Sequence, residues 1–264
     1  MSRNKLIADI QEKRTCLCVG LDTDLAKIPT HLKGRPNAIL EFNKAIIDAT
    51  ADCCVSYKIN TAFYECLGAK GWDLMEATLA YIPKNIFTIA DAKRGDIGNT
   101  STMYAKAFFE TLSFDAITVS PYMGSDSVKP FLEYKDKTTI ILALTSNAGS
   151  IDFEQLKTGD EFVYEKVLKT SKEWGTPDNM MYVVGATKAP SLAQIRAIVP
   201  EHFLLIPGVG AQGGDIDEVL KYGGIPGQTG LLVNSSRQIL YASSGEDFAE
   251  KARAEALKLS GKIS

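Results

Sequence analysis

The chain has 264 residues and a formal net charge of −3, with 45% hydrophobic and 23% charged residues, a composition typical of a globular protein that builds its core without metals or disulfides. This slightly acidic balance argues against a protein that binds a nucleic acid polymer, because such domains are usually basic. No apolar run approaches the ~18 residues of a membrane span, and the charged N-terminus lacks the apolar segment of a secretory signal, so we expect a soluble, cytoplasmic protein.

Eight short apolar runs alternate with longer amphipathic segments along the chain. Several of these runs are apolar at nearly every position, as strands buried on both faces of a parallel sheet must be. The predicted strands are Cys16–Leu21, Val55–Ile59, Ile86–Asp91, Ala116–Ser120, Thr139–Leu144, Met181–Gly185, Phe203–Pro207 and Gly230–Asn234. Apolar residues at helical spacing predict helices between them. The predicted helices are Leu6–Gln11, Asn37–Thr50, Thr100–Leu112, Gly124–Tyr134, Phe162–Trp174, Leu192–Val199, Ile216–Tyr222 and Glu246–Leu259.

The order of these elements predicts the fold. Strands that alternate with helices imply a parallel sheet with right-handed crossovers. An open, doubly wound sheet is the competing arrangement, but eight strand–helix units in a chain of this length fit a closed barrel better. We therefore predict an α/β protein whose residues 1–264 form a single (β/α)8 TIM barrel, with an additional N-terminal helix at Leu6–Gln11 that covers the barrel floor.

The chemistry of such barrels lies at the carboxyl ends of the strands and in the loops that follow them. The longest irregular stretch after a predicted strand is Thr145–Leu156, and loops of this length in compact domains are more often functional than idle. Polar residues at the carboxyl ends of the predicted strands should converge on one mouth. They are Asp22, Lys58, Asn60, Asp91, Lys93, Asp96, Ser120, Ser146, Asn147, Gln212 and Arg237.

The densest charged cluster follows the third predicted strand. Asp91 and Lys93 are two residues apart on an extended segment, so their side chains should point the same way. A buried aspartate needs compensation, which Lys93 supplies and which Lys58, on the neighbouring strand, can extend. The pattern predicts a chain of alternating charges, Lys58–Asp91–Lys93–Asp96. An ion-pair network that only stabilises the rim of a barrel would show the same spacing.

The cysteines and histidines do not form a metal-binding pattern. Zinc sites need closely spaced ligands such as CxxC, usually with histidines nearby. The five cysteines, at positions 16, 18, 53, 54 and 66, lack that spacing, and neither His31 nor His202 lies near them in sequence. We expect these cysteines to be structural and the protein to hold no metal.

Five segments, in order along the chain, resemble those of one known family. Asp91-Ala-Lys-Arg-Gly-Asp-Ile97 matches the DxKxxDI signature of the orotidine 5′-monophosphate decarboxylases and follows the third strand, as it does there. The other four segments are Cys18-Val-Gly-Leu-Asp22, Tyr57-Lys-Ile-Asn60, Pro207-Gly-Val-Gly-Ala-Gln212 and Val233-Asn-Ser-Ser-Arg237. The chain is thus similar to this family over residues 18–237. Two further segments, Lys58-Ile-Asn-Thr-Ala-Phe-Tyr-Glu65 and Thr145-Ser-Asn-Ala-Gly149, resemble its longer bacterial subgroup in particular. The chain departs from many relatives in carrying Ser236-Arg237 where they carry Gly-Arg.

The resemblance implies a homodimeric barrel lyase that uses no cofactor and converts orotidine 5′-monophosphate to UMP and CO2, the final step of de novo pyrimidine nucleotide synthesis. Lys93 would stabilise the negative charge that develops at C6 of the pyrimidine and then donate its proton there. Asp91 would hold Lys93 in place, and Lys58 would bridge Asp91 and the ribose hydroxyls. Asp96 and Thr100 would reach into the site of the partner subunit.

The resemblance also implies contacts to the substrate. Arg237 would bind the phosphate through two parallel hydrogen bonds, beside Ser236. Gln212 would reach over the phosphate toward the pyrimidine, although the glycine-rich segment around it would also suit an ordinary turn from strand to helix. The remaining implied contacts are Asp22 and Asn60 at the ribose and Ser146 at the pyrimidine edge. For Asp22 the cap of a following helix is an alternative role.

Two other functions fit the same fold. One is a metal-dependent sister barrel acting on a sugar-phosphate acid, such as a 3-keto-gulonate phosphate decarboxylase, which carries a similar Asp-x-Lys-x-x-Asp pattern together with carboxylate ligands for magnesium. Lys58 stands where such an enzyme would carry a glutamate. The other is a barrel that binds a nucleotide without catalysis. The charged residues argue against it, because a mere binder gains little from so costly a buried cluster.

Overall fold

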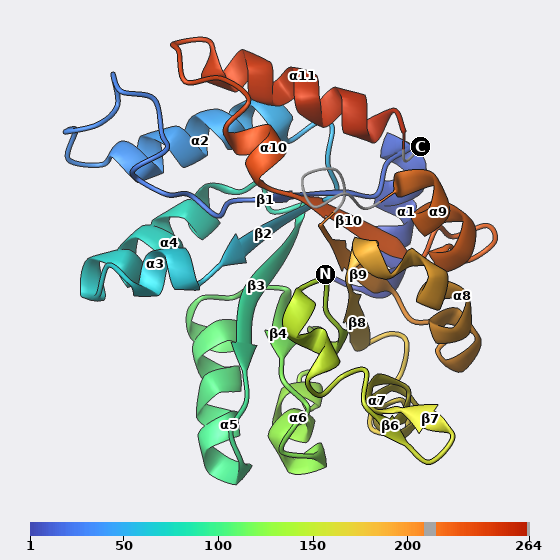
Figure 1. Cartoon of the computed structure of the whole chain (residues 1–264). Helices are drawn as coiled ribbons and strands as arrows, with labels where there is room; N and C mark the ends of the chain where they lie inside the picture. The colour runs from blue at the N-terminus through green and yellow to red at the C-terminus, as the bar shows by residue number, and fades with distance from the viewer. Residues whose placement is uncertain (209–214, 263–264) are drawn as a thin grey trace.

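The computed structural model describes residues 1–208 and 215–262, and these form a closed barrel of parallel strands surrounded by helices (Figure 1). The barrel strands are β1 Leu17–Gly20, β2 Ser56–Asn60, β3 Phe87–Arg94, β4 Ala116–Val119, β5 Thr138–Leu144, β8 Met180–Val184, β9 Leu204–Pro207 and β10 Leu231–Ser235. Each strand pairs with its neighbour in chain order, and β1 closes the barrel by pairing with both β2 and β10. The predicted TIM barrel and all of its predicted strands are confirmed.

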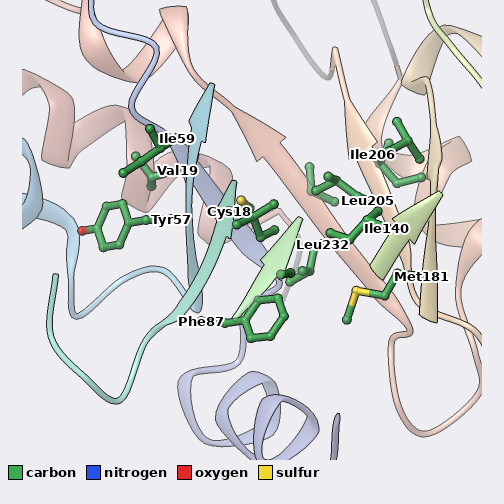
Figure 2. Close-up of a cluster of buried hydrophobic side chains, with 14 of the residues drawn as sticks. Cys18, Val19, Tyr57, Ile59, Phe87, Ile140, Met181, Leu205, Ile206 and Leu232 are labelled. Atoms are coloured by element: carbon green, nitrogen blue, oxygen red, sulfur yellow. The ribbon is translucent and has the colours of Figure 1, made fainter. Parts of the chain in front are cut away.

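The strands are apolar on both faces because both faces are buried. Tyr57 of β2 points outward, where its hydroxyl donates to the carbonyl of Ile47 on helix α2 (Ala38–Thr50). The neighbouring residue Ser56 points inward, where its hydroxyl accepts from the thiol of Cys18 on β1. Figure 2 shows Cys18 and Phe87 among the buried side chains gathered between the strands, with Tyr57 on the outer side. This alternation fills the barrel with side chains and leaves its carboxyl end as the place for a site.

The helices surround the barrel in chain order, except that α1 lies at its floor (Figure 1). Besides α2 they are α1 Arg3–Lys13, α3 Ala62–Glu65, α4 Ala69–Tyr81, α5 Gly98–Lys106, α6 Ser125–Leu132, α7 Val163–Ser171, α8 Ala189–Ile198, α9 Ile216–Gly223, α10 Arg237–Leu240 and α11 Phe248–Ser260. Within the described parts of the chain, no helix combines the length and the apolar character needed to cross a membrane.

Helix α4 is an element that the sequence pattern does not predict. Its buried positions are helically spaced, but two of them are Gly71 and Thr78 rather than large apolar residues, which hides the periodicity. Glycine is required at position 71, because a β-carbon there would lie 1.7 Å from the carbonyl oxygen of Tyr64. The backbone of α4 therefore packs closely against the segment that follows β2.

Two predicted segments have more structure than expected. The helix predicted at Thr100–Leu112 is confirmed as α5, which continues into the wider π-helical turn η1 (Ala107–Thr111). The stretch Thr145–Leu156, predicted to be irregular, contains the short 3-10 helix η2 (Ala148–Ile151). It is followed by a small hairpin of β6 (Lys157–Thr158) and β7 (Glu161–Phe162).

The predicted N-terminal helix is confirmed as α1, and it lies at the amino ends of the strands. Arg3 donates to the carbonyl of Glu201, which precedes β9, at 3.0 Å. Lys13 donates to the carbonyl of Cys54, which precedes β2, at 2.8 Å. The buried side chains of Leu6 and Ile10 face the core. Helix α1 thus covers the floor of the barrel, as the sequence predicts.

Candidate functional site

A cavity of about 390 Å³ lies at the carboxyl ends of the strands, on the side of the barrel opposite α1. Six or more elements contribute to its wall, as expected of a barrel site. The lining residues are Asp22, Lys27, Lys58, Asn60, Phe63, Asp91, Pro207, Gly208, Asn234, Ser235, Ser236, Arg237 and Tyr241. Six of these were predicted from the sequence as site residues, namely Asp22, Lys58, Asn60, Asp91, Ser236 and Arg237.

A chain of ion pairs forms one wall of this cavity. The Lys58 ammonium lies 3.1 Å from Asp22 Oδ1 and 3.1 Å from Asp91 Oδ2. The Lys93 ammonium lies 2.6 Å from the other oxygen of Asp91. Strands β1, β2 and β3 are adjacent in the barrel, which brings the three elements together. Lys93 does not belong to the described cavity lining, but its ammonium contacts the carboxylate of Asp91, which does.

The charged groups of this ion-pair network stabilise one another. Burial alone would lower the pKa of Lys58, but Asp22 and Asp91 outweigh it and hold this pKa above its ordinary value. Burial would likewise raise the pKa of Asp91, but Lys58 and Lys93 hold it well below its usual range. Lys58 and Asp91 are therefore both charged at neutral pH. The site presents fixed charges to a ligand.

The end of β3 departs from regular strand geometry. Lys93 has a φ of 47°, in the left-handed region that residues other than glycine rarely adopt. The register between β3 and β4 shifts between Ala90 and Arg94. The predicted contact of Asp91 with Lys93 is confirmed, but the backbone at Lys93 is not extended, so simple strand alternation does not explain it. Thr118 of β4, which the sequence analysis did not single out, contacts both residues at this irregularity.

Asp96 does not join the ion pairs that form within this polypeptide. Its carboxylate accepts a hydrogen bond from the backbone N–H of the next residue, Ile97, at 2.8 Å, and among the described residues it has no ion pair. Thr100 lies in the first turn of α5 and is exposed. The network in this chain is therefore Asp22–Lys58–Asp91–Lys93, in place of the predicted Lys58–Asp91–Lys93–Asp96.

The other end of the cavity is formed by the segment after β10. Ser236 precedes the short helix α10, and Arg237 is its first residue, with an exposed side chain. Gly208 lines the cavity from the end of β9 with a φ of 92°, a conformation that favours glycine. Gln212, predicted to bind the substrate, lies outside the described residues.

Asp22 and Asn60 lie in the cavity wall, as predicted. The alternative role of Asp22 as a helix cap is not supported, because turns rather than a helix follow it as far as α2. Ser146 lies at the end of β5, outside the described lining, and its carbonyl accepts from the hydroxyl of Thr187 at 3.4 Å. Asn147 instead contacts the hydroxyl of Thr145.

Several residues of the cavity wall were missed by the sequence analysis. Asn234 lies within a segment that resembles the family, so it could have been found by considering every residue of that segment. Phe63 follows Asn60 closely, so it could have been found by extending the segment that ends there. Lys27 and Tyr241 lie farther from their strands, and no local pattern marks them. Tyr241 nevertheless fixes the loop after β1, since its hydroxyl donates to the carbonyl of Asp22 at 3.1 Å.

The spacing of the cysteines and histidines predicts no metal site. Within residues 1–208 and 215–262, no group of three or more histidine, cysteine or acidic side chains is placed to hold a metal ion. Cys16 and Cys18 are buried, and burial raises the pKa of each to about 12. These thiols are therefore protonated at neutral pH and belong to the core.

Comparison with known proteins gives a consistent result over nearly the whole chain. Residues 15–252 match the model of a family described as orotidine 5′-phosphate decarboxylase / HUMPS. The orotidine 5′-phosphate decarboxylase of Flavobacterium johnsoniae is 61% identical over 262 residues, which cover 98% of this chain and 96% of that protein. The protein of the same name from Christiangramia forsetii is 60% identical over 259 residues, covering 97% and 95%.

Solved structures show the same similarity. The structure of Leishmania donovani OMP decarboxylase superimposes with a TM-score of 0.84 at 37% identity, covering 99% of this chain and 100% of that one. The structure of Leishmania donovani UMP synthase superimposes with a TM-score of 0.86 at 38% identity. That match covers 98% of this chain, which spans 57% of the longer UMP synthase chain.

Proposed function

The chain belongs to the orotidine 5′-phosphate decarboxylase / HUMPS family and is a carboxy-lyase of pyrimidine synthesis that acts on orotidine 5′-phosphate. We propose that its Asp22–Lys58–Asp91–Lys93 network carries out the decarboxylation. The observation that carries this proposal is the unbroken chain of ion pairs along the cavity wall. A ring carbon that loses CO2 carries negative charge in the transition state, and fixed cations stabilise such charge without reorganising.

In the proposed reaction, the bond between C6 of the pyrimidine and its carboxylate breaks, and the electron pair stays on C6. The Lys93 ammonium stabilises this pair and then transfers one proton to C6, which gives UMP and CO2. Asp91 holds Lys93 through their 2.6 Å contact. Lys58 keeps Asp91 ionised and in place and reaches the ribose hydroxyls. Water then returns a proton to Lys93, and no cofactor takes part.

The rest of the cavity would hold the remainder of the nucleotide. Arg237 is proposed to bind the phosphate, since a guanidinium can form two parallel hydrogen bonds with it. Its position after the last strand, beside the end of β9, is where barrels of this type commonly bind phosphate. Ser236 and Gln212 would complete the phosphate end. Asp22 and Asn60 would contact the ribose, and Ser146 would contact the pyrimidine edge once the substrate is bound.

We also propose that the active form is a homodimer in which Asp96 and Thr100 serve the site of the partner subunit. Large apolar side chains are exposed on the loops and helices that follow β3, β4 and β5. They are Ile97, Met103, Tyr122, Met123, Ile151, Phe153 and Leu156. Exposed apolar residues in such number mark an interaction surface. Asp96 lies beside this surface and, among the described residues, has no cation of its own chain to pair with.

The proposed reaction is tested by following the absorbance of orotidine 5′-phosphate with EDTA present and no cofactor added. We expect UMP and CO2 in equal amounts, at a rate that EDTA does not change. A rate that falls with EDTA and returns with Mg²⁺ would favour the metal-dependent alternative. Binding of UMP without any release of CO2 would instead indicate a nucleotide-binding barrel.

The proposed exchange of residues between subunits is tested by mixing two inactive variants, Lys93→Ala and Asp96→Ala. Random pairing should restore about a quarter of the wild-type activity, because half of the dimers would be mixed and each would hold one intact site of two. A mixture of Lys93→Ala with Lys58→Met is the control. Both of those residues serve the site of their own chain, so that mixture should stay inactive. Failure of the first mixture, with mixed dimers shown to form, would place Asp96 in its own subunit's site.

A further inference from the structure

Thr118 of β4 lies beside Asp91 and Lys93, the two residues proposed to act directly in the reaction. The register leaves residues 91–93 of β3 opposite this single residue of β4, since regular pairing resumes only at Arg94. Thr118 is fully buried. Its side chain therefore lies against the irregular stretch that carries both Asp91 and Lys93.

The Thr118 hydroxyl forms two hydrogen bonds of opposite sense. It accepts from the backbone N–H of Lys93 at 2.9 Å and donates to Asp91 Oδ1 at 3.0 Å. A hydroxyl can do both at once, whereas a hydrocarbon side chain can do neither. One buried atom thus connects the main chain of Lys93 to the carboxylate that receives the Lys93 ammonium.

Both oxygens of Asp91 are held by these contacts. Oδ2 faces the Lys58 ammonium, and Oδ1 accepts from Lys93 Nζ and from Thr118. The carboxylate cannot rotate without losing one of these partners. The backbone at Lys93 needs a comparable restraint, because a left-handed lysine persists only where its surroundings hold it.

We propose that Thr118 is a positioning residue, whose hydroxyl fixes the left-handed turn at Lys93 and the orientation of Asp91 so that the Lys93 ammonium is aimed at the reacting carbon. This inference rests on the proposed roles of Asp91 and Lys93. Thr118 itself does not line the described cavity wall and need not touch the substrate. Its effect should therefore appear in turnover rather than in binding.

The test compares Thr118→Val, which keeps the shape and removes the hydroxyl, with Thr118→Ser, which keeps the hydroxyl. We expect Thr118→Val to lower kcat by roughly 10- to 100-fold, as small displacements of a reacting group do, with KM changed by less than about threefold. Thr118→Ser should restore most of kcat. Thr139→Val is the matched control. Thr139 is a buried threonine of the neighbouring strand β5, and its hydroxyl has no hydrogen-bond partner among the described residues.

The outcomes separate this role from simpler ones. A Thr118→Val enzyme with wild-type kcat would overturn the proposal, as would equal losses in Thr118→Val and Thr118→Ser. A change in KM alone would make Thr118 a binding residue, and a comparable loss in Thr139→Val would indicate general damage to the barrel. Lys93→Ala is measured alongside. If it stays active, the proposed function itself fails, whereas an inactive Lys93→Ala beside a fully active Thr118→Val refutes only the role of Thr118.

Discussion

Lys58 is the most deeply buried charged side chain of the site, with 3% of its side chain exposed, and it contacts two carboxylates. Removing ions from water costs several kcal/mol each, and mutual attraction offsets this only when the geometry is good. A buried cluster of this kind is therefore weak evidence for stability, since apolar residues often stabilise such positions as well or better. A role in catalysis explains this buried cluster better, because fixed charges beside the reacting carbon stabilise the negative charge that develops there.

Arg237 is proposed to bind the phosphate, and its removal tests that assignment. Arg237→Ala removes the proposed charged hydrogen bonds to the phosphate, so KM for orotidine 5′-phosphate should rise by about 10- to 100-fold. Steady-state kinetics measure this directly. Arg35→Ala is the control, because Arg35 is an exposed arginine that pairs with Glu41 away from the cavity. An unchanged KM in Arg237→Ala would remove the phosphate assignment.

At the scale of elements, the phosphate end depends on how closely β1 approaches the turn after β10. A β-carbon on Gly20 would lie 1.9 Å from Ser236 Oγ and 2.9 Å from Ser236 Cβ. Gly20→Ala should therefore displace this turn, raise KM and lower the free energy of unfolding by about 1–3 kcal/mol, as overpacking does. Kinetics and urea denaturation measure the two effects. Gly261→Ala is the control, since its nearest neighbouring atom would lie at 3.5 Å. Wild-type KM and stability in Gly20→Ala would show that the turn has room to adjust.

The elements that the sequence could predict are those whose signal is local. The barrel strands are continuous apolar runs because both of their faces are buried, and this pattern is visible without a structure. Helix α4 is hidden because Gly71 and Thr78 occupy its buried face. The contact of Asp91 with Lys93 was predictable from spacing, but the left-handed backbone at Lys93 was not. That conformation depends on Thr118, which is distant in sequence. The Thr118 hydroxyl reaches the backbone N–H of Lys93 only because β3 pairs with β4.

The residues of the candidate site likewise divide into those that the local sequence predicts and those that it does not. Asp22 and Asn60 follow or end a strand, and Lys58 and Asp91 lie within two or three residues of a strand's carboxyl end, so the barrel rule places all four near the mouth. Tyr241 joins the wall only because the chain returns after β10 to the loop that follows β1. The proposed contact of Asp96 with a partner subunit leaves even less trace in the local sequence. The sequence places Asp96 in a charged run, and only the three-dimensional structure shows that it stands apart from the ion pairs of its own chain.

In the molecule as a whole, the residues proposed for catalysis lie at the mouth of the barrel, whereas residues at its floor contribute to stability. Arg196 is partly buried near the floor, where its guanidinium donates to the carbonyls of His202 and Gly223. His202 is 6% exposed, and neither ring nitrogen has a hydrogen-bond partner among the described residues. Burial, followed by repulsion from nearby cations such as Arg196, lowers the pKa of His202 to about 4.

This shift predicts how stability depends on pH. The ordinary pKa of histidine, near 6.5, applies to the unfolded chain, which therefore binds the proton more tightly than the folded protein does. The contribution of His202 is fully present above about pH 6.5 and is lost as the pH falls toward 4, by on the order of 3 kcal/mol. His202→Phe should remove this loss, which urea denaturation between pH 7 and pH 4 would measure. Parallel pH profiles for the two proteins would mean that His202 is not the group responsible.

The proposed role of Lys93 as proton donor is tested most directly by the turnover of orotidine 5′-phosphate by Lys93→Ala at neutral pH. Lys84→Ala serves as the control, because Lys84 is an exposed lysine that precedes the opposite end of the same strand. Half of the Lys93 side chain is exposed, at 49%, so its truncation should leave the protein folded. We expect a kcat at least about 10³-fold lower for Lys93→Ala, with Lys84→Ala at the wild-type rate. A folded Lys93→Ala protein with a kcat within tenfold of wild type would contradict the claim that Lys93 delivers the proton.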